Sequence, residues 1–291
     1  MSASLKTAES ISDAVRRVCR RHAGSSLKCL RKATRPEAVH EARKEIKKLR
    51  AVFRLARGEL AKADYRKISK AMRLAAKPMA ALRDAQVKRL ALETLAGKNA
   101  KQKFPDLSAA LEKNSRRKRR DFERHDLAAV AKLILKKVCR QLGDLNLKRS
   151  GTATPEQCLK KSYCRGQDAW RAASHDPTPE NLHKWRRQTK HFWHQLQFLC
   201  PEWPVKTSAM VDELEKLGDE LGDDHDLVLL KQFAGEHGRR AGETSELNRL
   251  IDSRRKQLAE KFQRRGAQLF GKTAEETCAQ LKRDWKTWRG G

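Results

Sequence analysis

The 291-residue sequence contains few aromatic residues, 5% of the total, and lacks the patterns that mark β-strands and membrane spans. No run of β-branched residues alternates with polar ones over the length of a strand, which argues against a β-sheet fold. No stretch approaches the roughly 18 uncharged apolar residues of a membrane-spanning helix, and the N-terminus lacks the apolar block of a secretory signal. We therefore expect a soluble, helical protein of the cytoplasm.

The motifs of metal, redox and nucleotide chemistry are also missing. Seven cysteines, an odd number, occur without a C-x-x-C pair, which argues against a disulfide framework and a zinc knuckle. The sequence has no P-loop, no Gly-rich dinucleotide fingerprint and no G-x-S-x-G nucleophile elbow. We therefore expect no metal site, no cofactor and no catalytic residues, and we predict that the protein is not an enzyme.

Basic residues, by contrast, are in large excess. The chain has 66 lysines and arginines against 36 acids, a formal net charge of +30 at pH 7, and so much self-repulsion indicates a negatively charged partner. Residues 1–150 carry 41 basic and 15 acidic residues, whereas residues 151–291 carry 25 and 21. The sequence therefore predicts a polyanion held mainly by the N-terminal half, and it leaves open whether the more acidic half takes part.

One motif occurs twice. Residues 36–44 read PEAVHEARK and residues 179–187 read PENLHKWRR, so both contain P-E-x-[apolar]-H-x-x-R-[KR], at an offset of 143 residues. The same offset pairs Lys47 with Lys190. Such self-similarity indicates that the chain consists of two copies of one unit of about half its length.

Each copy has the pattern of helices, because apolar residues recur at helical spacing and prolines stand at first-turn positions. Pro78 is expected to kink one helix without ending it, and residues 143–155 form the predicted linker. Four main helices per half predict an all-α fold of two pseudo-symmetric four-helix bundles, about 5–145 and 154–288, within one domain spanning 5–290. The predicted helices lie at about 8–33, 36–58, 64–96, 107–142, 154–174, 179–199, 207–235, 243–270 and 274–288.

The helix that carries each motif copy has a cationic face opposite an apolar face, at 100° per residue. A solvated face needs only polarity, but both of these cationic faces begin with histidine and continue with arginine or lysine, which favours contact with a ligand. The cationic faces carry His40, Arg43, Lys44, Lys47 and Arg54 in the first copy, and His183, Arg186, Arg187, Lys190 and His194 in the second. The apolar faces carry Ala42, Ile46, Leu49 and Phe53 in the first copy, and Trp185, Thr189, Phe192 and Leu196 in the second.

Further basic clusters lie on the predicted first and fourth helices, where a run of arginines is typical either of a solubilising surface or of a polyanion contact. Arginine offers bidentate hydrogen bonds to phosphate oxygens, lysine offers a point charge, and histidine offers a donor whose protonated form a polyanion favours. The predicted polyanion-binding residues are Arg17, Arg20, Arg21, His40, Arg43, Lys44, Lys47, Arg50, Arg54, Arg116, Arg120, His183, Arg186, Arg187 and Lys190.

The two motif copies are followed by residues 82–87, LRDAQV, and by a looser counterpart at residues 224–229, DHDLVL. In this order the motifs resemble the CHAD family, the conserved-histidine α-helical domains, over nearly the whole chain. The resemblance implies two pseudo-symmetric four-helix bundles with a strongly basic groove or pore that binds inorganic polyphosphate without chemistry. His40 and His183 would be the namesake histidines. An association with polyphosphate granules in the cytoplasm would follow from such binding.

Other functions stay open from the residues alone. The charge would also attract DNA or RNA, although the few aromatic residues leave little for base stacking. A metal-dependent phosphoryl-transfer enzyme would use the Asp-rich segment of residues 219–226, whose carboxylates suit magnesium, and a scaffold would bind an acidic protein. Polyphosphate has no bases, so a surface of arginine, lysine and histidine is chemically sufficient for it. Polyphosphate is therefore the preferred partner.

Overall fold

The computed structural model describes residues 3–145 and 155–290, and in these two segments the chain forms helices joined by short turns, with no β-strand. The predicted all-α fold is confirmed. Most of the predicted linker, residues 146–154, lies outside the described residues. None of the helices in the described segments is long and apolar enough to cross a membrane.

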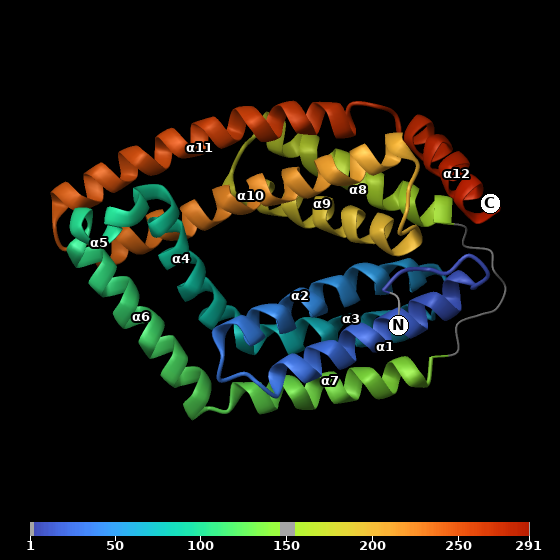
Figure 1. Cartoon of the computed structure of the whole chain (residues 1–291), viewed down its shortest axis with the longest axis horizontal. Helices are drawn as coiled ribbons and strands as arrows, with labels where there is room; N and C mark the ends of the chain where they lie inside the picture. Colours follow the sequence, from blue (N-terminus) through green and yellow to red (C-terminus); the bar gives the residue numbers. More distant parts are fainter. Residues whose placement is uncertain (1–2, 146–154, 291) are drawn as a thin grey trace.

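The N-terminal helices form one packed group (Figure 1). Its members are α1 (Ile11–Leu30), α2 (Pro36–Phe53), α3 (Lys62–Ala76) and α7 (Leu127–Gly143), and a 3-10 helix, Arg54–Gly58, continues α2. The side chain of Ser10 caps α1 by accepting a hydrogen bond from the backbone N of Asp13 at 3.1 Å. α2 begins with Pro36, at a position where the missing N–H has no intrahelical partner. α1 packs against α2 and α7, and α3 also packs against α2 and α7.

The C-terminal helices form a second group. Its members are α8 (Pro155–His175), α9 (Pro179–Leu199), α10 (Val205–His237) and α11 (Ala241–Phe270), and α12 (Ala274–Gly290) packs on α8. Thr178 caps α9 by accepting a hydrogen bond from the backbone N of Asn181 at 3.3 Å. α9 packs between α8 and α10, and α10 packs against α11. The two groups fall on either side of the predicted linker, while their origin from one duplicated unit stays a prediction.

A third set of helices connects the two groups. This set consists of α4 (Ala80–Ala96), α5 (Ala100–Lys103) and α6 (Pro105–Arg124). A 3-10 turn at Lys77–Met79 joins α3 to α4, and another at Gly97–Asn99 joins α4 to α5. In Figure 1 these helices form one side of the molecule, between α7 and the far ends of α10 and α11. α4 packs against α6 and α10. Contacts between the N-terminal and C-terminal halves therefore include α2 against α9 and α4 against α10.

The prediction that Pro78 only kinks a helix spanning 64–96 is wrong. α3 ends at Ala76, a 3-10 turn follows, and α4 begins at Ala80 and runs in a different direction (Figure 1). Proline has no N–H, and its ring clashes with the carbonyl of the preceding turn. The interruption lets α3 pack on α7 while α4 reaches α10.

The predicted helix at 107–142 is also two helices, α6 and α7. Between them Asp126 adopts the left-handed conformation, with a φ of 37°, and its side chain accepts a hydrogen bond from the backbone N of Ala129 at 3.2 Å. Aspartate enters this region more readily than most residues and is a good N-cap. One residue therefore both redirects the chain and starts α7.

The predicted apolar faces of α2 and α9 are confirmed, because each of their eight residues is at most 1% exposed. Trp185 packs edge-on against Phe262, with ring centroids 5.8 Å apart. It also lies so close to Gly266 that a Cβ there would be 2.6 Å from the indole Cζ2. A buried hydrogen bond joins α9 directly to α2, since Gln195 Nε2 donates to the carbonyl oxygen of Ala51 at 3.1 Å.

A second polar contact between the halves caps α6. The carboxylate of Glu243, near the start of α11, accepts hydrogen bonds from the backbone N of Asp106 at 3.4 Å and of Leu107 at 3.3 Å. Arg240 forms an ion pair with Asp106 at 2.9 Å. The carboxylate thus satisfies N–H groups that have no intrahelical partner and complements the positive end of the helix dipole.

Trp185→Ala should lower the free energy of unfolding by about 3–5 kcal/mol, because it removes a fully buried indole and leaves a cavity. Urea denaturation followed by circular dichroism measures the loss. The control is Leu133→Ala, because Leu133 lies on α7 and is 70% exposed. This change should alter the free energy of unfolding by about 0.5 kcal/mol or less. A loss under about 1 kcal/mol for Trp185→Ala would contradict the close packing between α9 and α11.

Candidate polyanion-binding site

The cationic faces of α2 and α9 meet where the two helix groups touch. α2 packs beside α9, which brings Lys47 near Arg186 and brings Arg50 and Arg54 near Arg187. Side chains that the sequence places about 140 positions apart are therefore neighbours. The contact therefore brings basic side chains of both halves of the chain together.

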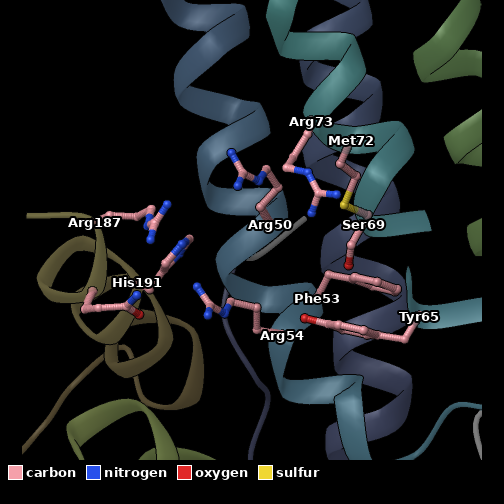
Figure 2. A pocket seen from close by; sticks show the side chains of 10 residues that line it. Arg50, Phe53, Arg54, Tyr65, Ser69, Met72, Arg73, Arg187 and His191 are labelled. Atoms are coloured by element: carbon pink, nitrogen blue, oxygen red, sulfur yellow. The ribbon is translucent and has the colours of Figure 1, made fainter. Parts of the chain in front are cut away.

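Where the C-terminal end of α2 lies near the middle of α9, cations surround a pocket of about 240 Å³, which we call the arginine pocket. Figure 2 shows Arg50 of α2, Arg54 of the 3-10 helix that continues α2, Arg73 of α3, and Arg187 and His191 of α9 around this space. Among the residues that the structure describes, none that lines the pocket is acidic. The lining residues are Arg50, Phe53, Arg54, Tyr65, Ser69, Met72, Arg73, Arg187, Gln188 and His191.

The arginines of the pocket repel one another and have no anionic partner. Burial lowers the pKa of Arg50, and Arg73 and Arg187 lower it further. Burial also lowers the pKa of Arg54 to about 10, with Tyr65 opposing the decrease and Arg187 adding to it. Within the described segments, none of the four guanidinium groups forms a hydrogen bond or an ion pair. Their donors are available to an anionic ligand.

His191 contributes a different kind of donor. The residue is 9% exposed, and its Nε2 atom is buried without a hydrogen-bond partner among the described residues. Burial, followed by the charges of Arg54 and Arg50, holds the pKa of His191 well below its usual value. The ring is therefore neutral at neutral pH. An unpaired buried nitrogen costs free energy, so Nε2 is a candidate to donate a hydrogen bond to a ligand.

An aromatic pair closes the pocket on the side of α3 (Figure 2). The rings of Phe53 and Tyr65 are stacked, with centroids 5.3 Å apart and an interplanar angle of 3°. Arg57 lies over the Tyr65 ring, with its guanidinium carbon 5.7 Å from the centroid. An apolar wall has a lower dielectric constant than water, and it therefore strengthens the field of the neighbouring cations.

At the other end of the α2–α9 contact lie His40 of α2, His183 of α9 and His225 of α10, and we call this region the histidine end. The His183 and His225 ring centroids are 4.8 Å apart. Burial lowers the pKa of all three, and the next largest cause is Arg83 for His40, His225 for His183 and Arg186 for His225. The three histidine rings of the histidine end are therefore neutral at neutral pH.

Acidic side chains lie among the cations of the histidine end. Burial, Arg186 and Arg43 lower the pKa of Lys47 to about 8, although solvent still reaches the lysine, and Asp226 opposes the decrease. Burial raises the pKa of Asp226 itself, while Arg186, Arg83 and Lys47 oppose that rise. This end of the contact therefore has mixed charge, unlike the arginine pocket.

The Asp-rich segment of α10 mainly pairs with basic side chains of neighbouring helices. In the part of the chain that the structure describes, no group of three or more His, Cys, Asp or Glu side chains is placed to hold a metal ion. The segment instead supplies counterions to α9 and α11. Its ion pairs are Asp219 with Lys190 at 2.9 Å, Asp224 with Arg255 at 2.7 Å, and Glu220 with Arg265 at 3.0 Å.

Two glycines of α10 make room for the cations of α9. A Cβ at Gly218 would lie 2.5 Å from Cε of Lys190, and a Cβ at Gly222 would lie 2.7 Å from Nη2 of Arg186. The two glycines are one turn apart on the same helix face. Their missing side chains let Lys190 and Arg186 cross the surface of α10, where Lys190 reaches Asp219.

Several predicted residues lie away from the arginine pocket. Arg17 donates hydrogen bonds to the carboxylate of Glu9 and to the carbonyl oxygen of Ser4. Lys44 forms an ion pair with Glu41 at 3.1 Å. These two cations already have anionic or carbonyl partners. Arg20 and Arg21 are exposed on α1, and Arg116 and Arg120 line a concavity on α6.

Sequence reasoning missed four residues of the basic surface: Arg73, Arg83, Arg165 and His191. Arg83 lies in the conspicuous segment at residues 82–87 and could have been found there. Arg73 comes from α3, and Arg165 comes from α8 and lies near Arg54. Neither belongs to a motif, so only the packing of the helices reveals them. His191 falls between the cationic and apolar faces of its helix, where periodicity gives no signal.

Comparisons with known proteins agree with this fold. The model of the CHAD domain matches residues 14–235. The CHAD domain from the plant Ricinus communis is 20% identical, with a TM-score of 0.58 and 88% of each chain covered. PptA from Streptomyces chartreusis is 17% identical, with a TM-score of 0.67 and coverage of 90% of this chain and 99% of that chain. A comparison with curated proteins gives no match. The two structures show a shared fold, and since the family model spans most of the sequence, the chain belongs to the CHAD domain family.

Proposed function

We propose that this CHAD domain binds inorganic polyphosphate along the contact between α2 and α9, centred on the arginine pocket, and does so without catalysing a reaction. The observation that carries the proposal is the convergence of four guanidinium groups from three helices on one space that holds no carboxylate among the described residues. Charge-assisted hydrogen bonds from arginine to phosphate oxygens are strong and geometrically specific. Membership of the family, whose resemblance implied polyphosphate binding, supports the same ligand.

Polyphosphate fits this surface better than nucleic acid does. Proteins that bind single strands stack the bases on exposed aromatic rings. Phe53, Trp185 and Phe192, which lie on the two helices of the site, are at most 1% exposed and form the core. A chain of phosphates needs no stacking surface, and the side chains present supply what its oxygens require.

The proposal of binding without chemistry rests on the nature of the pocket side chains. Arginine keeps its proton in proteins, so the guanidinium groups cannot act as general acids or bases. We expect long-chain polyphosphate to keep its length when it is incubated with the protein and Mg²⁺. Gel electrophoresis of the chain, together with an assay of released phosphate, tests this expectation. Progressive shortening that requires the folded protein would show that the domain is an enzyme.

Arg50→Gln combined with Arg187→Gln should weaken the binding of long-chain polyphosphate about 100-fold or more, because each change removes charge-assisted hydrogen bonds worth about 1.5–3 kcal/mol. Calorimetric titration at about 150 mM salt, where weak attraction is largely screened, measures the loss. The control combines Arg124→Gln with Arg140→Gln, at exposed arginines of α6 and α7 outside the pocket. It removes the same charge and should change affinity by about threefold or less.

Equal losses in the two double variants would mean that net charge alone attracts the ligand, and the proposed site would be wrong. Tighter binding of single-stranded RNA or duplex DNA than of polyphosphate by the unmodified protein would overturn the choice of ligand. Both double variants should keep the helical circular dichroism spectrum of the unmodified protein.

Polyphosphate affinity should also fall as the pH rises through about 8. The pKa of Lys47 is lowered to about 8 by burial and by Arg186 and Arg43, so the free protein carries this charge below that pH and loses it above. Binding at higher pH must then include uptake of a proton. Lys47→Arg stays charged and should flatten the decline between pH 7 and 9 in the same titration. An unchanged pH profile in Lys47→Arg would show that titration of Lys47 does not cause the decline.

The cellular role that we propose is association with polyphosphate granules in the cytoplasm. A long chain that fills the arginine pocket can extend beyond it to other basic clusters. The contributions of Arg20, Arg21, Arg116 and Arg120 stay predictions, and their replacement by glutamine in the same assay would measure them. Loss of affinity for long chains alone would show that the ligand reaches α1 or α6.

A further inference from the structure

Positive charge is not spread evenly along the α2–α9 contact. At the histidine end, Asp84, Asp223 and Asp226 lie among the cations and partly balance them. In the arginine pocket, four guanidinium groups surround about 240 Å³ and no described lining residue is acidic. The charge is therefore concentrated at one point rather than distributed along a line.

A linear phosphate chain is also uneven. Each interior phosphate has one ionised oxygen, whereas the phosphate at each end has a second ionisable oxygen. In this respect an end group resembles a phosphomonoester, which carries a charge of about −1.5 to −2 at pH 7. The densest positive charge of the protein therefore matches the densest negative charge of the chain.

A neutral donor at the same place adds a second observation. The Nε2 atom of His191 is buried, lines the pocket and has no hydrogen-bond partner in the described segments. Figure 2 shows this ring beside Arg54 and Arg187, facing the same space. A phosphate oxygen in the pocket would satisfy it, and buried polar atoms are normally satisfied.

We propose that the arginine pocket binds the terminal phosphate group of a linear phosphate chain, with Arg50, Arg54 and Arg187 donating to its oxygens and Nε2 of His191 completing the set. The inference rests on the proposed function for the identity of the chain, and it adds which part of the chain occupies the pocket. The interior phosphates then leave the pocket along α2 toward Lys47.

Occupation of the pocket should change the charge of His191. Burial, followed by the charges of Arg54, Arg50 and Arg187, lowers the pKa of His191 and keeps the ring neutral in the free protein, whereas a doubly charged phosphate favours the protonated ring. Nitrogen chemical shifts of the histidine ring report that change directly. The charged and titratable groups that act on the ring are Arg50 on α2, Arg54 on the 3-10 helix that continues α2, and Arg187 and His194 on α9. Tyr65 on α3 and Arg165 on α8 lie near Arg54.

The experiment compares three small ligands in calorimetric titrations at about 150 mM salt without divalent cations. Linear tripolyphosphate has end groups, cyclic tetrametaphosphate has a similar total charge and none, and ATP carries an end group on a nucleoside. We expect tripolyphosphate to bind with a stoichiometry of one, about tenfold or more tighter than the cyclic ligand. We also expect it to bind more tightly than ATP. Tighter binding of ATP would overturn the assignment to an inorganic chain.

Variants of His191 test the proposed donor. His191→Gln keeps an N–H donor and should retain tripolyphosphate affinity within about threefold, whereas His191→Phe removes the donor and should lose about tenfold. If His191→Phe fails to fold, the ring-nitrogen chemical shifts of His191 in the unmodified protein replace it in the test, and shifts that do not change when tripolyphosphate is added would exclude the contact. Equal affinities of His191→Gln and His191→Phe would exclude the hydrogen bond.

The two proposals fail in different ways. If the unmodified protein binds long-chain polyphosphate but binds linear and cyclic ligands equally, the proposed function stands and the end-group site is wrong. If it does not bind long-chain polyphosphate at all, the proposed function itself is wrong.

Discussion

Burial of the apolar faces of α2 and α9 holds a set of like charges together against their own repulsion. Two unit charges about 8 Å apart repel by about 2 kcal/mol at an effective dielectric constant of about 20. The arginine pocket contains several cations, and none of its lining residues in the described segments is acidic. Core residues such as Phe53 and Phe192, each 1% exposed, contribute about 1.5–3 kcal/mol apiece. Packing therefore offsets the repulsion between the cations. A polyanion that entered the pocket would remove this repulsion, and the free energy released would add to the free energy of binding.

The C-terminal half limits this repulsion elsewhere. The acids nearest to the basic surface lie on α10, where Asp219 pairs with Lys190, and Asp226 lies among the cations near Lys47. The glycines of α10 allow the cations of α9 to approach these acids closely. Internal counterions thus cover part of the basic surface and leave the arginine pocket uncovered. The unequal charge of the two halves reflects this division between the basic surface and its structural support.

Local periodicity was sufficient to predict the all-α fold and the two helix faces that build the site. Their apolar residues are buried as predicted, because a helix with one apolar face has few ways to pack. The sequence could not reveal that Arg73 and Arg165 join the site, since their positions depend on how α3 and α8 pack. Periodicity also did not predict the break between α6 and α7 at Asp126. The helical pattern continues on both sides of this residue, and its left-handed backbone conformation redirects the chain.

The cap on α6 has a consequence for synthesis of the chain on the ribosome. The carboxylate of Glu243 is made 137 residues after the Asp106 N–H that it binds, which at about 5–20 residues per second is a delay of roughly 7–27 s. Gln195 similarly follows its acceptor Ala51 by 144 residues. Until those segments emerge, the nascent N-terminal half has an uncapped α6 and an exposed α2 surface that later lies against α9. The two halves of the protein therefore mature together, even though one is translated first.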